Sequence, residues 1–371
     1  MQKRNLKIII SGGGTGGHIF PAIAIANALK KIRPDVDILF VGAKGKMEME
    51  KVPAAGYPIE GLWISGLKRE FSLDNLSFPF KLISSLANSQ KIIRKFKPDA
   101  VVGVGGFASG PLMYMASVNG VPNLIQEQNS YPGITNKLLA KKAKKICVAY
   151  PGMEKYFPAD KIILTGNPVR QDVVKLDGKR PRGLEEFGLE DNKLTLLIIG
   201  GSQGALSINE SILSGLDILS QNNIQILWQT GKNFYSKAKD EVEKRGLKSV
   251  KVYDFINKMD FAYAVADIVV SRSGASSVSE LSLVKKPVIL VPYPFAAEDH
   301  QTKNAMALVN HKAAILISDK DARKKLIDQV ISLANSKEKR EKLENSITAL
   351  GLQNSADVIA NEVIKIALDK K

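Results

Sequence analysis

A strand, a glycine-rich loop and a helix follow one another twice in this chain. An apolar run at 6–10 leads into the loop 11–18, which reads SGGGTGGH, and residues 22–32 then show helical spacing. A second apolar run at 194–199 leads into the loop 200–204, which reads GGSQG, and a helical pattern follows. A strand–loop–helix start of this kind opens a doubly wound parallel sheet. The repetition predicts two α/β domains in tandem.

The rest of the chain continues this alternation. Its 371 residues are enough for two domains that each bury a core. We expect an N-terminal domain over 1–168, a C-terminal domain over 169–355 and a terminal amphipathic helix over 356–371, with 166–189 as the linker. Pro21 is expected in the first turn of the first helix. Further strands are expected at 38–41, 100–104, 123–125, 145–148, 162–164, 224–229, 250–253, 268–270 and 288–291.

The net charge of +16 is unevenly spread, with +12 over 1–168 and +4 over the remainder. Such a basic half favours an anionic partner, which could be nucleic acid, an anionic membrane or a phosphorylated substrate.

The single cysteine, Cys147, excludes a disulfide framework. No apolar stretch approaches the roughly 20 residues of a membrane span. We therefore expect a cytosolic setting, with a membrane reached only at its surface.

The first glycine loop has the G-x-G-x-x-G pattern at Gly12, Gly14 and Gly17, where the backbone and a helix N-terminus can approach a phosphate. The next expected strand ends in 42–44 without the acid that a nicotinamide cofactor needs. His18 follows this loop, where the helix start would lower the pKa of the imidazole and keep it neutral as a base. A tight turn and a loop-packing histidine are the structural alternatives.

Two further patterns have open interpretations. Ser277 and Glu280 form S-x-x-E, which is either a capping box or a carboxylate for ribose hydroxyls. Residues 63–86 mix apolar and basic side chains, and a second basic cluster follows over 137–145. This mixture is typical of a surface that contacts an anionic leaflet, although a loop that packs its own aromatic side chains is the alternative. The expected contact residues are Leu67, Lys68, Arg69, Phe78, Phe80, Lys81 and Leu82.

Several motifs occur in one order along nearly the whole chain. They are GGTGGH at 13–18, GVGG at 103–106, QEQN at 126–129, GNPVR at 166–170, GGSQGA at 200–205, RSGA at 272–275, and Gln301 with Asn304. Together they closely resemble the MurG family of bacterial N-acetylglucosaminyltransferases, which make lipid II of the cell wall. The chain departs from the family at Gln126, where many members carry histidine.

The resemblance implies a GT-B fold, with two Rossmann-like domains separated by a cleft and the last helix returning to the N-terminal domain. It implies inverting transfer of N-acetylglucosamine from UDP-N-acetylglucosamine to the muramic acid 4-hydroxyl of lipid I, without a cofactor or an essential metal. The implied setting is the cytoplasmic face of the membrane. The implied partners are UDP-N-acetylglucosamine, lipid I, the anionic leaflet and other cell-wall synthesis proteins, with no nucleic acid.

The resemblance also implies site residues. His18 is the expected base and Glu127 the second choice, and the ribose interpretation of Glu280 is now favoured over the cap. Backbone groups near Ile256 would recognise uracil. Two alternatives remain open: a related glycosyltransferase that acts on diacylglycerol, and a non-catalytic nucleotide-binding or nucleic-acid-binding protein. The expected donor contacts are Thr15, Gly16, Gly17, Asn129, Arg170, Ser202, Ile256, Ala275, Ser276, Ser277, Val278, Ser279, Glu280 and Gln301.

Overall fold

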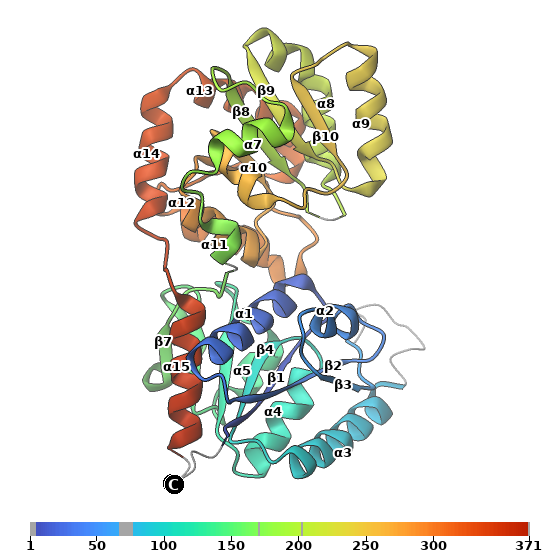
Figure 1. The fold of residues 1–371 in the computed structure, drawn as a ribbon, viewed down its shortest axis with the longest axis vertical. Coiled ribbons are helices and arrows are strands. Elements are labelled where there is room, and N and C mark those ends of the chain that lie inside the picture. The colour runs from blue at the N-terminus through green and yellow to red at the C-terminus, as the bar shows by residue number, and fades with distance from the viewer. Residues whose placement is uncertain (1–4, 67–76, 170, 202, 370–371) are drawn as a thin grey trace. The chain divides into compact units, whose positions relative to one another are not determined.

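The computed structural model describes residues 5–66, 77–169, 171–201 and 203–369 (Figure 1). It forms two compact units. Unit 1 comprises Met1–Val169 with Leu352–Lys371, and unit 2 comprises Arg170–Gly351. The division therefore falls one residue after the expected boundary at 168, and residues 352–355 belong to unit 1.

Unit 1 is built on a parallel sheet of seven strands in the order β3-β2-β1-β4-β5-β6-β7. Ile8 and Ile10 of β1 join a core with helices α1 and α15, whereas Ile9 joins a second core with α3 and α4. Since successive strand residues face opposite sides, both faces of the sheet are covered. The elements are β1 (Lys7–Gly12), α1 (Gly16–Ile32), β2 (Asp37–Ala43), α2 (Glu48–Ala54), β3 (Ile59–Leu62), α3 (Phe78–Phe96), β4 (Ala100–Gly105), α4 (Ser109–Val118), β5 (Asn123–Glu127), α5 (Ile134–Leu139), β6 (Lys145–Val148), β7 (Ile162–Leu164) and α15 (Ser355–Leu368).

Unit 2 holds a parallel sheet of six strands in the order β10-β9-β8-β11-β12-β13. Leu196, Ile198 and Trp228 anchor a core against α8, α9 and α13. The prediction of two doubly wound parallel sheets is confirmed. The elements are α6 (Gln171–Val174), α7 (Arg180–Phe187), β8 (Leu194–Ile199), α8 (Leu206–Gln221), β9 (Ile224–Gln229), α9 (Lys232–Lys244), β10 (Val250–Tyr253), α10 (Met259–Val265), β11 (Ile268–Ser271), α11 (Ala275–Val284), β12 (Val288–Leu290), α12 (His300–Val309), β13 (Ile315–Leu316), α13 (Ala322–Ala334) and α14 (Lys337–Thr348).

Two local predictions are wrong. Helix α1 begins at Gly16, directly after the glycine loop, so Pro21 lies inside the helix rather than in its first turn. The expected linker over 166–189 instead contains α6 and α7. Arg180 on α7 donates a 2.9 Å hydrogen bond to the carbonyl oxygen of Val265 and pairs with Asp267. These contacts make α7 part of unit 2.

The C-terminal helix α15 lies beside α1 in unit 1 (Figure 1). Ile359 and Val363 of α15 are buried in the same core as Ile25 and Leu29 of α1. None of the helices in the described part of the chain combines the length and the apolar character needed to cross a bilayer.

Candidate functional site

The glycine loops of unit 1 lie at the carboxyl edge of its sheet, which is where doubly wound sheets bind ligands. The backbone N–H of Gly13, after β1, donates to the carbonyl oxygen of Gly105, at the end of β4, at 3.3 Å. A Cβ at Gly106 would lie 2.3 Å from the carbonyl oxygen of Gly13. The two loops touch through backbone atoms, so position 106 requires glycine.

His18 lies in the first turn of α1, beside this contact. Its Nδ1 is 3.0 Å from the carbonyl oxygen of Gly13 and 3.3 Å from Oγ1 of Thr15. A carbonyl oxygen only accepts hydrogen bonds, so we assign the imidazole proton to Nδ1. In the neutral ring, Nε2 then holds the lone pair. The expected base is therefore held in a tautomer in which Nε2 can take a proton.

Glu127 ends β5 and is 1% exposed. Its Oε1 accepts from the backbone N–H of Asn129 at 3.0 Å and from the Asn129 side-chain amide at 3.2 Å. Its Oε2 accepts from the backbone N–H of Gly133 at 3.2 Å and from the Asn136 side chain at 2.8 Å. Burial raises the pKa of the Glu127 carboxyl, and these donors limit the rise. Glu127 thus anchors the loop that carries Asn129.

Glu48 is a candidate that the sequence analysis missed. Strand β2 ends without an acid, but Glu48 follows Ala43 by five residues and its side chain returns to the same edge of the sheet. Oε1 accepts from the N–H of Ala43 and Oε2 from the N–H of Gly14, each at 2.9 Å. Glu48 is fully buried. Its position in the sequence shows only an acid at the start of a helix, so no local signal reveals this contact.

In unit 2, α11 begins at Ala275 and Gly274 is its extended N-cap. Ser277 and Glu280 both lie inside the helix, so the capping-box interpretation is wrong. The Tyr263 hydroxyl donates to Oε2 of Glu280 at 3.0 Å. Oγ of Ser276, in the first turn, is buried and has no hydrogen-bond partner among the described residues. Glu280, Ser276 and the first-turn N–H groups are thus brought together on α11.

The structure shows the surroundings of three other residues that are expected to contact the UDP-sugar. Val278 is 1% exposed, so its side chain belongs to the core, and Ser279 donates to the carbonyl oxygen of Ala275 within the same helix at 2.9 Å. The N–H of Ile256 already donates to Oε1 of Gln229 at 3.0 Å. Among the backbone groups near Ile256 that are expected to recognise uracil, this N–H is therefore already bonded, and the Ile256 carbonyl is the candidate that remains.

Gln301 ties the start of α12 to neighbouring loops. Its Oε1 accepts from the N–H of Tyr293 at 3.0 Å, and its backbone carbonyl accepts from Oγ of Ser273 at 2.9 Å. The side-chain amide N–H2 of Gln301 is then the group that can donate to a ligand. Thr15 is the exposed N-cap of α1, and Gly16 and Gly17 open that helix.

Part of the expected membrane surface is also refined. Phe80 on α3 is 69% exposed, and Ile83, which the expected set lacked, is 66% exposed. Phe78 and Leu82 instead pack against the core of unit 1, because they lie on the inner side of α3. Lys81 Nζ lies 5.9 Å from the centroid of the Trp63 ring.

Five expected residues lie outside the described part of the chain: Leu67, Lys68, Arg69, Arg170 and Ser202.

Within the described ranges, no group of three or more His, Cys, Asp or Glu side chains is placed to hold a metal ion.

Comparisons with known proteins cover both units. Residues 8–148 match the glycosyltransferase family 28 N-terminal domain, and residues 195–362 match the glycosyltransferase family 28 C-terminal domain. A relative from Parabacteroides distasonis is 55% identical over 99% of this chain and 100% of its own length, and one from Flavobacterium psychrophilum is 55% identical over 98% and 99%. Both are named UDP-N-acetylglucosamine–N-acetylmuramyl-(pentapeptide) pyrophosphoryl-undecaprenol N-acetylglucosamine transferase.

A solved structure gives the same assignment. The crystal structure of Acinetobacter baumannii MurG superposes with a TM-score of 0.80 at 26% identity, over 98% of this chain and 100% of that one. The two parallel-sheet units have the GT-B class of fold, as expected. With both family domains matched and full-length relatives at 55% identity, the chain belongs to glycosyltransferase family 28 and, within it, to the MurG N-acetylglucosaminyltransferases.

Proposed function

We propose that this chain transfers N-acetylglucosamine from UDP-N-acetylglucosamine to the 4-hydroxyl of N-acetylmuramic acid in the pyrophosphoryl-undecaprenol-linked acceptor, lipid I, with inversion at the sugar's anomeric carbon. The products are lipid II and UDP. The observation that carries the proposal is the 55% identity, over 99% of the chain, to a relative that bears this activity in its name. The reaction places the enzyme in peptidoglycan synthesis, and so in cell growth and division.

His18 supplies the base in this proposal. The acceptor oxygen attacks the anomeric carbon while Nε2 of His18 takes its proton, and the bond to UDP breaks with its electron pair on the diphosphate. The hydrogen bond from Nδ1 to the Gly13 carbonyl holds the ring and stabilises the imidazolium that forms. A positioned general base typically increases the reaction rate by about 10²–10⁴-fold. Glu127 is the weaker candidate, because four N–H donors already occupy its oxygens.

Unit 2 binds the donor in this proposal. The first turn of α11 offers N–H groups without helical partners, together with the buried Ser276 hydroxyl, and these suit the charge that develops on the departing diphosphate. Glu280 accepts hydrogen bonds from the ribose hydroxyls, and Tyr263 fixes the direction of its carboxylate. The Gln301 amide and the Ile256 carbonyl are further groups that contact the UDP-sugar.

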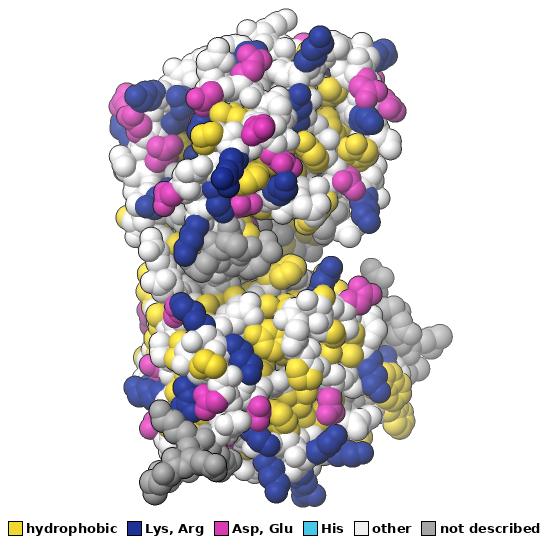
Figure 2. Space-filling view, viewed as in Figure 1, with side chains coloured by type: hydrophobic (Ala, Val, Ile, Leu, Met, Phe, Trp, Pro, Cys, Tyr) yellow, Lys and Arg dark blue, Asp and Glu magenta, His cyan; other side chains and the backbone are white. Residues whose placement is uncertain are grey.

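The membrane face of this proposal is the helical layer α3–α4–α5 of unit 1. Exposed apolar side chains share this layer with lysines, and Nζ of Lys142 lies 4.4 Å from the Tyr114 ring centroid. Figure 2 shows Lys and Arg side chains gathered at the lower edge of this unit, where α3 and α4 end in Figure 1. The exposed apolar members are Phe80, Ile83, Tyr114, Val118, Ile134 and Leu138.

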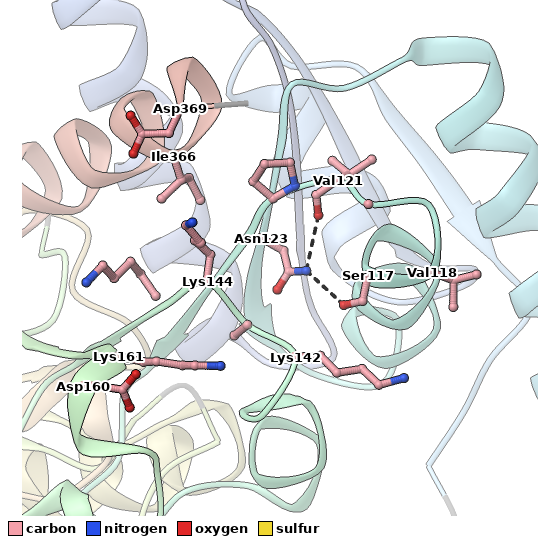
Figure 3. Close-up of a pocket in the computed structure, with 14 residues that line it drawn as sticks. Ser117, Val118, Val121, Asn123, Lys142, Lys144, Asp160, Lys161, Ile366 and Asp369 are labelled. Atoms are coloured by element: carbon pink, nitrogen blue, oxygen red, sulfur yellow. Dashed lines mark hydrogen bonds between the residues drawn. The ribbon is translucent and has the colours of Figure 1, made fainter. Parts of the chain in front are cut away.

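A cavity of about 810 Å³ adjoins this layer at the amino edge of β5 and β6 (Figure 3). Four lysines and two aspartates line it, which leaves a positive balance suited to the phosphates of anionic lipid headgroups. The charged lining residues are Lys142, Lys144, Lys145, Lys161, Asp160 and Asp369. We place this face on the anionic cytoplasmic leaflet. Other cell-wall synthesis proteins remain expected partners on the strength of the family resemblance alone.

One assay tests the proposed reaction. Purified protein is incubated with radiolabelled UDP-N-acetylglucosamine and a lipid I analogue, with and without EDTA, and diacylglycerol replaces the analogue in a parallel sample. We expect the label to enter the lipid I analogue only, at the same rate with and without EDTA. NMR of the product should show an anomeric configuration opposite to that of the sugar in UDP-N-acetylglucosamine. Transfer to diacylglycerol alone would support the related lipid glycosyltransferase. UDP binding without transfer to either acceptor would support a non-catalytic nucleotide-binding protein.

A further inference from the structure

The carboxylate of Glu48 and the imidazole of His18 bind opposite ends of one peptide group. Oε2 of Glu48 accepts from the N–H of Gly14 at 2.9 Å, and the carbonyl oxygen of Gly13 accepts from Nδ1 of His18 at 3.0 Å. That N–H and that carbonyl belong to the same amide, which joins Gly13 to Gly14. The two side chains are thus connected through a single rigid and polarisable unit.

This peptide group is held tightly on two sides. A Cβ at Gly13 would lie 2.1 Å from Oε1 of Glu48, and a Cβ at Gly106 would lie 2.3 Å from the Gly13 carbonyl oxygen. At the end of β2, a Cβ at Gly42 would lie 2.5 Å from Cγ of Glu48. The glycines at 13, 42 and 106 therefore make room for the carboxylate and for the peptide that it binds.

The hydrogen bonds of the Glu48 side chain are those that suit a carboxylate. Both of its oxygens accept from backbone N–H groups, which can only donate, and the residue is fully buried. A buried charge is costly unless hydrogen bonds compensate it. The buried Glu48 carboxylate therefore stabilises the loop next to His18. These hydrogen bonds account for the position of Glu48 without any ligand contact.

We propose that Glu48 is a positioning residue for the base: it acts through the Gly13–Gly14 peptide to hold His18 as the Nδ1–H tautomer and to raise the basicity of Nε2. The negative carboxylate polarises the peptide, so the Gly13 carbonyl becomes a stronger acceptor for Nδ1–H. A stronger acceptor at Nδ1 stabilises the imidazolium that forms when Nε2 takes the acceptor's proton. The inference rests on the proposed role of His18 as the base.

A direct test follows the His18 ring without any turnover. The chain has three histidines, so ¹⁵N-histidine NMR of the full protein is interpretable, and His18→Ala assigns the His18 signals. We expect the Nδ1–H tautomer in the wild type, and a His18 titration midpoint at lower pH in Glu48→Gln. Glu50→Gln is the matched control, because Glu50 lies on the same helix α2 but is exposed. It should titrate as the wild type does.

Two NMR results would overturn the proposal. An Nε2–H tautomer in the wild type would do so without any variant, even if Glu48→Gln failed to fold. An unchanged tautomer and midpoint in a folded Glu48→Gln would do so as well.

A double-mutant cycle tests the same link in catalysis. Loss of a charge-assisted hydrogen bond should lower kcat of Glu48→Gln about 10-fold, with little change in KM for the UDP-sugar. In a His18→Ala background the same change should cost less than about 2-fold, because the effect passes through the imidazole. Equal slowing in both backgrounds would overturn the proposal. Wild-type turnover in His18→Ala itself would instead refute the base assignment, and the NMR titration would still decide the role of Glu48.

Discussion

The Tyr263 hydroxyl donates a 3.0 Å hydrogen bond to Oε2 of Glu280. Tyr263, on α10, is 1% exposed, whereas Glu280, on α11, is half-buried. A donor on a rigid, buried ring fixes the orientation of the carboxylate that it binds. In the proposed donor site, this hydrogen bond would orient Glu280, which has no capping role, to accept two hydroxyl groups from the ribose.

Glu280→Ala should therefore weaken UDP binding. Loss of charge-assisted hydrogen bonds to the ribose should cost roughly 1.5–3 kcal/mol, and Tyr263→Phe, which removes one hydrogen bond to the carboxylate, should cost about 0.5–1.5 kcal/mol. Isothermal titration calorimetry with UDP measures both, and circular dichroism checks the fold. Wild-type affinity in a folded Glu280→Ala would remove Glu280 from the donor site.

His18→Ala should lower turnover far more than donor affinity. A general base acts on the transition state, so kcat should fall by about 10²–10⁴-fold while the dissociation constant for UDP stays near its wild-type value. Steady-state kinetics over a pH series, together with calorimetry, separate the two effects. Turnover within a few-fold of the wild type across that series would make His18 structural and return Glu127 to consideration.

Phe80→Ser combined with Ile83→Ser should reduce binding to anionic vesicles and leave UDP affinity intact. Both side chains are about two-thirds exposed on α3, at 69% and 66%, and so can enter the interface without loss of core contacts. Co-sedimentation should also weaken with salt, because charge attraction is screened over about 8 Å at physiological ionic strength.

Ile218→Ser is the control for the membrane variant, because Ile218 is an exposed apolar residue on α8 of unit 2. It should bind vesicles as the wild type does. If the double variant sediments as strongly as the wild type, or if binding ignores lipid charge, the membrane surface lies elsewhere on the chain.

Cys147 should resist thiol reagents in the folded protein. It lies on β6 with no exposed surface, and burial, together with a smaller contribution from the Glu362 carboxylate, raises the pKa of its thiol to about 12. At pH 8 only about one thiol in 10⁴ is then the reactive thiolate. Because it is the sole cysteine, Ellman's reagent should report no fast reaction in buffer and one thiol per chain in urea. Stoichiometric labelling of the native protein at pH 8 would show that the site is open.

The sequence by itself determined the class of fold and most of its strands. The apolar runs at 145–148 and 194–199 became β6 and β8 with the expected bounds, because central strands of a parallel sheet are buried on both faces and read as continuous apolar runs. The short strand β3 was missed, since Ile59–Leu62 lacks such a run, and β13 was missed although residues 313–317 form a continuous apolar run. The ordered motifs also gave the family.

Only the tertiary structure decided which side chains meet. It placed Glu48 against Gly14, over 34 residues of chain, and turned Phe78 inward while Phe80 faces out. It also moved the N-cap of α11 to Gly274, which freed Glu280 from a capping role. A motif reports residues that are neighbours along the chain, whereas burial and hydrogen-bond partners depend on strands and helices that come together from distant segments. That is why the loop next to His18 could be recognised from the sequence, but the carboxylate that holds it could not.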